Sequence, residues 1–416
     1  MRTNRFLVAA AAITAVMLGL VGCSGGGSGG TEAGSTALPN KDVKATVNIW
    51  GYNEPKLTPW IVDAIAAMES EYKNVDVKYT YIPYDQIASK VLGTAVSGGS
   101  PDGIFYNPAD AANLAQSGVL ADMSPYWNSF ADKDQIPKSV QWVSDGKLVS
   151  LQGYVNTTAL YYNKAILDSL GLKPPTTVNE LDKALKLVSG AGYGGMTMCA
   201  VPNAESEFQI FPWMLGEGLN YGAWDKAKLT SVFSKFRDWI SKGYIPQDVV
   251  GWTQGDAFDK FSSGKFAFTQ NGNWQLGAAK KLPFEWGVVP IPAGADGSHS
   301  IGGGEGFSLV TKSKMAPLTW HFFEQALLTK KGELSILAQQ GSIPVRKDAA
   351  SADTISSDPS LTVYAQVVAD MGVRPSTSKI GEYLVKMGKI WNAVAGGQTA
   401  PGDAAQQVID QLSNVK

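Results

Sequence analysis

Cysteine and histidine are scarce in this chain, whose 416 residues contain only two of each. The two histidines, His299 and His321, stand apart in the sequence and form no histidine-based metal motif. A metal or siderophore receptor, which needs clustered ligands, is therefore not indicated. The cysteines are Cys23 and Cys199. If Cys23 is modified, as argued below, Cys199 has no partner for an intrachain disulfide, and we expect it to be a small buried hydrophobic residue.

An excess of charge of either sign is also lacking, with 35 Lys and Arg against 37 Asp and Glu. This balance gives no reason to expect a nucleic-acid partner. No phosphate-binding GxxxxGK[ST] motif occurs. The GxSxG match at 26–30 and the GxGxxG match at 25–30 lack the flanking strand and helix that their chemistry requires. We predict no cofactor and no metal.

The N-terminus has the pattern of an export signal. Arg2 and Arg5 precede an uncharged run over 6–20, which is long enough for a signal-peptide core and short for a membrane span. Leu20-Val21-Gly22-Cys23 resembles a bacterial lipobox, and the alternative is an ordinary secretory signal with an incidental cysteine. We predict a signal peptide over 1–22, a lipidated Cys23 with a flexible tether over 23–40, and anchoring to the outer face of the bacterial cell membrane.

From residue 45 onward, strand and helix patterns alternate. A strand at 45–50, a helix opened by Thr58 and Pro59, and alternating apolar residues from Val75 predict an α/β fold with a largely parallel, doubly wound sheet. Such sheets place their sites in loops at the carboxyl ends of the strands. Two such loops combine an aromatic residue with side chains that bond hydroxyls, namely Tyr52, Asn53 and Glu54 in one and Tyr106 and Asn107 in the other. For Tyr52 and Glu54 the alternative is a water-exposed loop.

Other local patterns predict individual elements. Residues 153–164 read as one strand, 229–242 as a helix with an apolar core stripe, and 315–340 as one long helix. Thr177 and Glu180 have the spacing of a capping box.

Residues 255–274, GDAFDKFSSGKFAFTQNGNW, predict a helix closed by Gly264, a strand from Lys265 to Thr269, and a loop that ends in Trp274. The amides of 270–273 offer donors and acceptors just before a large flat ring. Pyranose C–H faces stack on aromatic rings while hydroxyls bond to amides, so the stretch suits a sugar. The alternative is a turn followed by a core tryptophan.

The same stretch resembles extracytoplasmic sugar-binding proteins of ABC importers, the family of maltose-binding protein, in which AFxxGK is followed by a strand and NGxW. The resemblance continues through PDGIFYNPADAANLAQSGVL at 101–120, YYNK at 161–164, LGLKPPTT at 170–177 and GGxG at 303–306. Ala109 and Asp110 depart from the charged ligand contacts of maltose-binding proteins, so the sugar is not expected to bind in the maltose manner.

This resemblance implies two doubly wound lobes joined by three crossovers, like other periplasmic binding proteins. The expected N-terminal lobe comprises 41–155 and 303–341, and the C-terminal lobe comprises 156–302 and 342–416. A mono- or oligosaccharide would bind between the lobes, and the closed form would deliver it to the membrane permease of an ABC transporter. No enzymatic activity is expected.

The resemblance also implies ligand contacts at further positions. Trp213 is a candidate ligand contact whose alternative role is core packing. Arg346 either binds vicinal hydroxyls of the sugar or pairs with a carboxylate at the third crossover. Tyr383 falls where many relatives carry a stacking Trp. The candidate ligand-binding residues are Tyr52, Asn53, Glu54, Tyr106, Asn107, Tyr154, Asn156, Glu207, Phe208, Trp213, Trp274, Gly304, Glu305, Arg346 and Tyr383.

A carbohydrate-active hydrolase or lyase is the competing hypothesis. Such an enzyme needs two carboxylates across the scissile bond, and spacing in the sequence does not exclude Glu205 or Glu207 paired with Glu305. Unchanged sugar after incubation would separate binding from cleavage.

Overall fold

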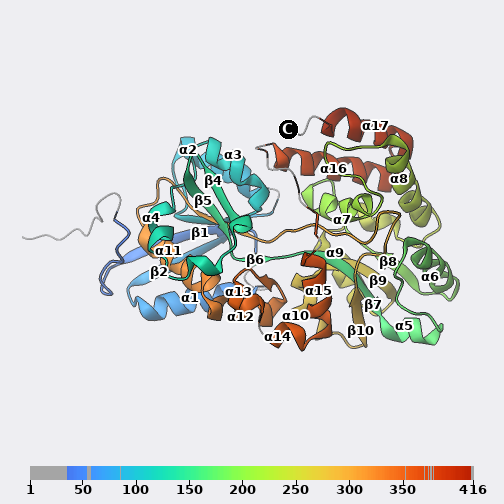
Figure 1. Ribbon diagram of the computed structural model, residues 1–416, viewed down its shortest axis with the longest axis horizontal. Helices are drawn as coiled ribbons and strands as arrows, with labels where there is room; N and C mark the ends of the chain where they lie inside the picture. Colours follow the sequence, from blue (N-terminus) through green and yellow to red (C-terminus); the bar gives the residue numbers. More distant parts are fainter. Residues whose placement is uncertain are drawn as a thin grey trace, which may run out of the picture.

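The protein consists of two α/β lobes that lie side by side (Figure 1). The structure, a computed structural model, describes residues 35–413 except 54–57, 85, 352, 370, 373, 375–376 and 378. The predicted signal peptide, Cys23 and Glu54 lie outside the described residues. Within them, no helix is long and apolar enough to cross a membrane.

The sheet of the N-terminal lobe has six strands. Their order is β2 (Val75–Tyr81), β1 (Ala45–Gly51), β3 (Gly103–Tyr106), β11 (Gly306–Leu309), β5 (Lys147–Gln152) and β4 (Gln141–Ser144). β1 runs parallel to β2 and β3, whereas β11 is antiparallel to β3 and β5. The prediction of a largely parallel sheet is therefore wrong. β11 enters from the other lobe and runs against its neighbours, and β4 and β5 form a hairpin turned by Asp145 and Gly146, both with positive φ.

The sheet of the C-terminal lobe has four strands in the order β10 (Trp286–Val289), β7 (Thr158–Asn163), β9 (Phe266–Gly272) and β8 (Gly194–Thr197). Only β8 and β9 pair in parallel. The apolar stripe predicted at 229–242 lies in α8 (Lys226–Ser241), where Phe233, Phe236 and Trp239 are buried in the lobe's core.

Helices cover both sheets. In the C-terminal lobe α16 (Ile380–Ala395) packs against α7 (Ala204–Leu215), α17 (Pro401–Leu412) against α8, and α15 (Pro359–Ala369) against β7 and β10. The remaining α-helices of the described residues are α1 (Pro59–Glu71), α2 (Ile87–Ser97), α3 (Ala111–Gln116), α4 (Ser124–Ser129), α5 (Lys164–Ser169), α6 (Val178–Gly190), α9 (Gln254–Ser262), α10 (Leu276–Ala279), α11 (Ala316–Phe323), α12 (Lys330–Gln340), α13 (Lys347–Ala350) and α14 (Asp353–Ser356).

Three segments of chain connect the lobes. β6 (Tyr154–Val155) pairs antiparallel with β12 (Ile343–Pro344), and Asn156 forms a bridge with Gly303 through N–H···O bonds of 3.1 and 2.7 Å. The ribbon containing β6 runs between the two lobes in Figure 1. The strand predicted over 153–164 is thus two strands, β6 and β7, interrupted where the chain leaves one lobe for the other.

Two local predictions also need correction. The helix predicted over 315–340 is broken into α11, a π-helical segment (Glu324–Leu328) and α12, and Thr329 caps α12 by accepting from the N–H of Gly332 at 3.1 Å. Thr177 caps α6 through the N–H of Glu180 at 3.2 Å, but the Glu180 carboxylate bonds to Thr176, so the reciprocal half of the box is shifted by one residue.

Candidate functional site

Glu305 brings together two other predicted residues. It lies just before β11, where its Oε1 accepts from Asn53 Nδ2 at 3.2 Å and its Oε2 from Asn156 Nδ2 at 3.4 Å. Asn53 follows β1 and Asn156 follows β6, so segments far apart in sequence meet at this carboxylate. Burial raises the pKa of Glu305, and hydrogen bonds from its neighbours oppose that rise.

Tyrosines surround this carboxylate. Burial is the main cause of the raised pKa values of Tyr52, Tyr79 and Tyr154, and the charge of Glu305 raises each of them further. The Oδ1 atom of Asn53 is buried without a hydrogen-bond partner among the described residues, while the buried hydroxyls of Tyr79 and Tyr154 lie near the Asn53 backbone and the Glu305 carboxylate, respectively. Tyr79 was not predicted as a site residue, although its place in the alternating pattern of β2 could have indicated it.

Asn156 ties the three crossovers to one another. Its Oδ1 accepts from Ser342 Oγ at 2.7 Å and from Asn273 Nδ2 at 3.2 Å, and its backbone pairs with Gly303. Asn273 Nδ2 also donates to the Gly341 carbonyl at 3.0 Å. Gly304, at φ 124°, has no room for a side chain, because a Cβ would lie 2.3 Å from the Tyr154 carbonyl oxygen.

The amides of residues 270–273 do not serve the role expected of them. Gln270, Asn271 and Asn273 are fully buried, and their side chains bond to the protein itself. Only Trp274, at the end of that stretch, is half-buried. A Cβ at Gly272 would lie 1.9 Å from Trp274 Cζ3, so the ring rests against the glycine backbone. The glycine of the NGNW pattern thus holds the ring in place.

Phe208 and Trp274 form an aromatic pair beside the second crossover. Their ring centroids are 6.0 Å apart at an interplanar angle of 51°, and both rings are half-buried. A Cβ at Gly303 would approach the Phe208 ring to 2.9 Å, which places Phe208 directly against the second crossover. Partly exposed rings at this position can stack on the apolar face of a ligand.

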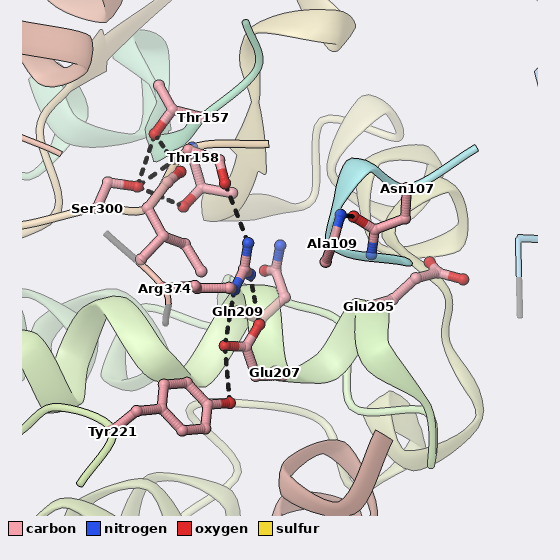
Figure 2. Close-up of polar contacts among 12 residues, drawn as sticks. Asn107, Ala109, Thr157, Thr158, Glu205, Glu207, Gln209, Tyr221, Ser300 and Arg374 are labelled. Atoms are coloured by element: carbon pink, nitrogen blue, oxygen red, sulfur yellow. Dashed lines mark hydrogen bonds and ion pairs between the residues drawn. The ribbon is translucent and has the colours of Figure 1, made fainter. Parts of the chain in front are cut away.

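Glu207 belongs to a buried ion pair (Figure 2). Arg374 donates to its Oε2 from Nη2 at 2.5 Å and to its Oε1 from Nε at 3.2 Å, and Tyr221 donates to Oε1 at 3.1 Å. Arg374 also donates from Nη1 to the Gly302 carbonyl at 3.0 Å, and its guanidinium lies over the Phe208 ring at 5.1 Å. Glu207 therefore orients Arg374, which contacts both the Gly302 backbone and the Phe208 ring.

A further tyrosine, Tyr84, lies near the predicted loops of the N-terminal lobe. Asn107 donates from Nδ2 to the Tyr84 hydroxyl at 2.6 Å, and Tyr84 packs edge-on against Tyr52 with centroids 4.9 Å apart. Tyr84 and Ala109 also pack against the core of the C-terminal lobe, so this edge contacts both lobes.

Tyr154 belongs to a hydrophobic core cluster but stands beside Glu305, whereas three other predicted aromatic residues lie in the cores. Tyr106 is fully buried in the N-terminal lobe and hydrogen-bonds to Ser308 Oγ at 2.9 Å. Trp213 is buried edge-on against Phe236 and donates to Gln270 Oε1 at 2.8 Å, which is the core packing given as its alternative. Tyr383 is buried on the core face of α16. We leave all three out of the proposed site.

Arg346 adopts the second of its two predicted roles. It is 3% exposed, donates to both carboxylate oxygens of Asp348 at 2.9 and 3.0 Å, and pairs with Asp132 at 3.1 Å. Its Nη1 donates to the Leu328 carbonyl at 2.7 Å. Arg346 stabilises the third crossover, and its guanidinium has no free pair of N–H groups that could bind vicinal hydroxyls.

The carboxylates that an enzyme would use are already engaged. Glu207 binds Arg374, Glu305 binds two amides, and Glu205 accepts from the N–H of Gln254 at 3.1 Å. In the part of the chain that the structure describes, no group of three or more His, Cys, Asp or Glu residues could hold a metal ion.

Solved structures share this fold. The GacH receptor of Streptomyces glaucescens, solved unliganded and with acarbose, matches 90% of this chain and all of its own at a TM-score of 0.79 and 21% identity. The maltotriose-binding protein of Thermus thermophilus, bound with maltotriose, matches 89% of this chain and 98% of its own at a TM-score of 0.73 and 21% identity.

Sequence comparison extends over nearly the whole chain. The galactooligosaccharide-binding protein of Bacillus subtilis is 22% identical over 415 residues, covering 95% of this chain and 94% of its own. The arabinooligosaccharide-binding protein of the same organism is 24% identical over 383 residues, covering 87% and 84%. These relatives are binding proteins, so the enzyme hypothesis has no support. The family described as bacterial extracellular solute-binding protein matches residues 63–363, and the chain belongs to that family.

Proposed function

We propose that this protein binds an oligosaccharide between its lobes and delivers it to the membrane permease of an ABC importer. The observation that carries the proposal is the half-buried pair of Phe208 and Trp274 beside the hinge, together with the polar cluster around Glu305. Aromatic faces and hydroxyl-bonding groups are the two kinds of contact that a sugar requires. The named relatives from Bacillus, which bind galacto- and arabinooligosaccharides, support this class of ligand.

The proposed site draws its contacts from both lobes and from the crossovers. Its residues are Tyr52, Asn53, Asn107, Tyr154, Asn156, Phe208, Gly304, Glu305 and Trp274, with Glu54 from outside the described residues and Glu207 acting through Arg374. A ligand that touches both lobes binds the closed form more tightly than the open one and shifts the population toward it by that difference in affinity.

The lobe boundaries given above remain part of the proposal, with 41–155 and 303–341 in one lobe and 156–302 and 342–416 in the other. The strand membership of the two sheets supports the division. The crossovers at 154–156, 303–304 and 342–344 would then act as the hinge.

A panel of maltotriose, an arabinooligosaccharide and a galactooligosaccharide tests the function. A ligand that binds only the folded state adds about 2.7 kcal/mol of stability at a hundredfold excess over Kd, so at least one sugar should raise the melting temperature. Chromatography after incubation should return that sugar unchanged. If none of the sugars shifts the melting temperature, or if one is cleaved, the proposal fails.

We further propose that the mature protein is anchored by a lipid on Cys23, at the outer face of the cell membrane. Membership of an extracellular family supports export, and the lipobox-like sequence at 20–23 supports the anchor. Cys23→Ser should still be exported but should move from the membrane fraction to the soluble fraction, because the lipid depends on the thiol. Cys199→Ser is the matched control and should stay with the membrane. Retention of the Cys23→Ser variant on membranes would contradict the anchor.

A further inference from the structure

Gln209 has an unusual environment. It lies on α7 with its side chain fully buried, yet neither its Oε1 nor its Nε2 atom has a hydrogen-bond partner among the described residues. A carboxamide offers two donor hydrogens and two acceptor lone pairs, and leaving them unmet in a buried site is costly. Native folds satisfy nearly all such groups, so each exception calls for an explanation.

The location of Gln209 indicates what would satisfy it. In Figure 2 the Gln209 side chain projects from α7 toward the side on which Arg374, Thr157 and Ser300 are drawn. Arg374 directs its own donors to Glu207 and the Gly302 carbonyl. Gln209 also directly follows Phe208, whose ring belongs to the proposed site.

The N-terminal lobe carries an unpaired polar atom of the same kind. Asn53 Oδ1 is buried without a partner in the described chain, and the Nδ2 atom of the same side chain donates to Glu305. Unmet hydrogen-bonding groups therefore occur in both lobes near the hinge, where the proposed ligand would lie.

Gln270 provides the internal comparison. It is buried to the same extent, but its Oε1 accepts from Trp213 Nε1 at 2.8 Å and its Nε2 donates to the Gln209 carbonyl at 2.7 Å. The fold thus satisfies one of two adjacent buried glutamines and leaves the other unsatisfied. A purely structural role explains Gln270 but leaves Gln209 unexplained.

We infer that Gln209 recognises the sugar by binding two adjacent hydroxyls, donating from Nε2 to one and accepting at Oε1 from the other. The carboxamide presents a donor and an acceptor side by side in one plane, and vicinal hydroxyls supply the complementary pair because each can donate or accept. This inference rests on the proposed function and adds a specificity-determining residue to it. Sugars that lack one of the two hydroxyls should be rejected, because half of the carboxamide would then stay unpaired.

Gln209→Met and Gln270→Met test the inference as a matched pair, measured by thermal melting and by titration with the three sugars of the panel. Gln209→Met should keep or raise the melting temperature, because it removes an unsatisfied polar group while keeping a similar shape. It should also lower the affinity for the sugar by at least about tenfold, because the hydrogen bonds from the carboxamide to the sugar are lost. Gln270→Met should lower the melting temperature and leave the affinity of the folded protein within about threefold of wild type, since a sugar does not contact it.

If the wild-type protein binds a sugar and Gln209→Met binds the same sugar with unchanged affinity, the inference is overturned and the proposed function stands. A melting temperature for Gln209→Met as low as that of Gln270→Met also overturns it, because the amide would then be structural. If the wild-type protein binds none of the three sugars, the proposed function fails and the inference fails with it.

Discussion

Arg374→Met is expected to lower the free energy of unfolding by about 3–5 kcal/mol, because it leaves the carboxylate of Glu207 buried without its cation. Glu207 is fully buried, and the pair is held by two hydrogen bonds of 2.5 and 3.2 Å. Tyr221 alone cannot compensate for the charge. Denaturant unfolding with a constant m-value is the appropriate measurement, since a change in m would indicate a change in the denatured state as well.

The double variant Arg374→Met with Glu207→Met is the control for that prediction. Replacing both members of a buried pair by apolar side chains is often close to neutral, so the double variant should recover most of the lost stability. A loss below about 1 kcal/mol in the single variant would be typical of a solvent-exposed pair and would contradict the burial described above. Both variants also remove the contact with the Gly302 carbonyl, so the stability difference between them isolates the unpaired charge.

Trp274→Ala is expected to weaken sugar binding by roughly tenfold to a hundredfold while changing the melting temperature little. Removing an aromatic ring that stacks on the ligand costs on the order of 1–3 kcal/mol of binding free energy. The cost to the fold is small because the ring is only half-buried and rests on the backbone of Gly272.

Trp213→Ala is the matched comparison, because Trp213 packs in the core of the C-terminal lobe. That truncation should cost roughly 3–5 kcal/mol of stability, and the fraction that remains folded should bind the sugar as wild type does. Calorimetric titration of both variants, with a melting curve for each, distinguishes the two tryptophans. Unchanged affinity in Trp274→Ala, or a melting temperature as low as that of Trp213→Ala, would remove Trp274 from the site.

Repeating patterns made several elements predictable from the sequence. The alternation of Val75 and Val77 indicated β2, and the spacing of Phe233, Phe236 and Trp239 indicated α8, because each pattern reflects one buried face. Positions at strand ends were informative too. Asn53, Asn156 and Glu305 each follow or precede a strand, and the fold brings them together.

The sequence was less informative about features that depend on the three-dimensional path of the chain. A likeness to a family places Tyr106 at the end of a strand and Tyr383 on a helix, but it does not say that their side chains face the cores. Arg374 and Glu207 are 167 residues apart, and no local pattern connects them. The direction of β11 could not be inferred either, because it depends on the path of the chain through the other lobe.

The central position of β11 has a consequence for the order of folding during synthesis. β11 lies between β3 and β5, so both of these strands keep an unpaired edge until residues 306–309 have left the ribosome. All four strands of the other sheet lie within residues 158–289. Pairings between distant segments also form slowly, because a long loop must close first. The second lobe in the sequence is therefore the first whose sheet can be completed, and the nascent N-terminal half stays open until the chain returns to it.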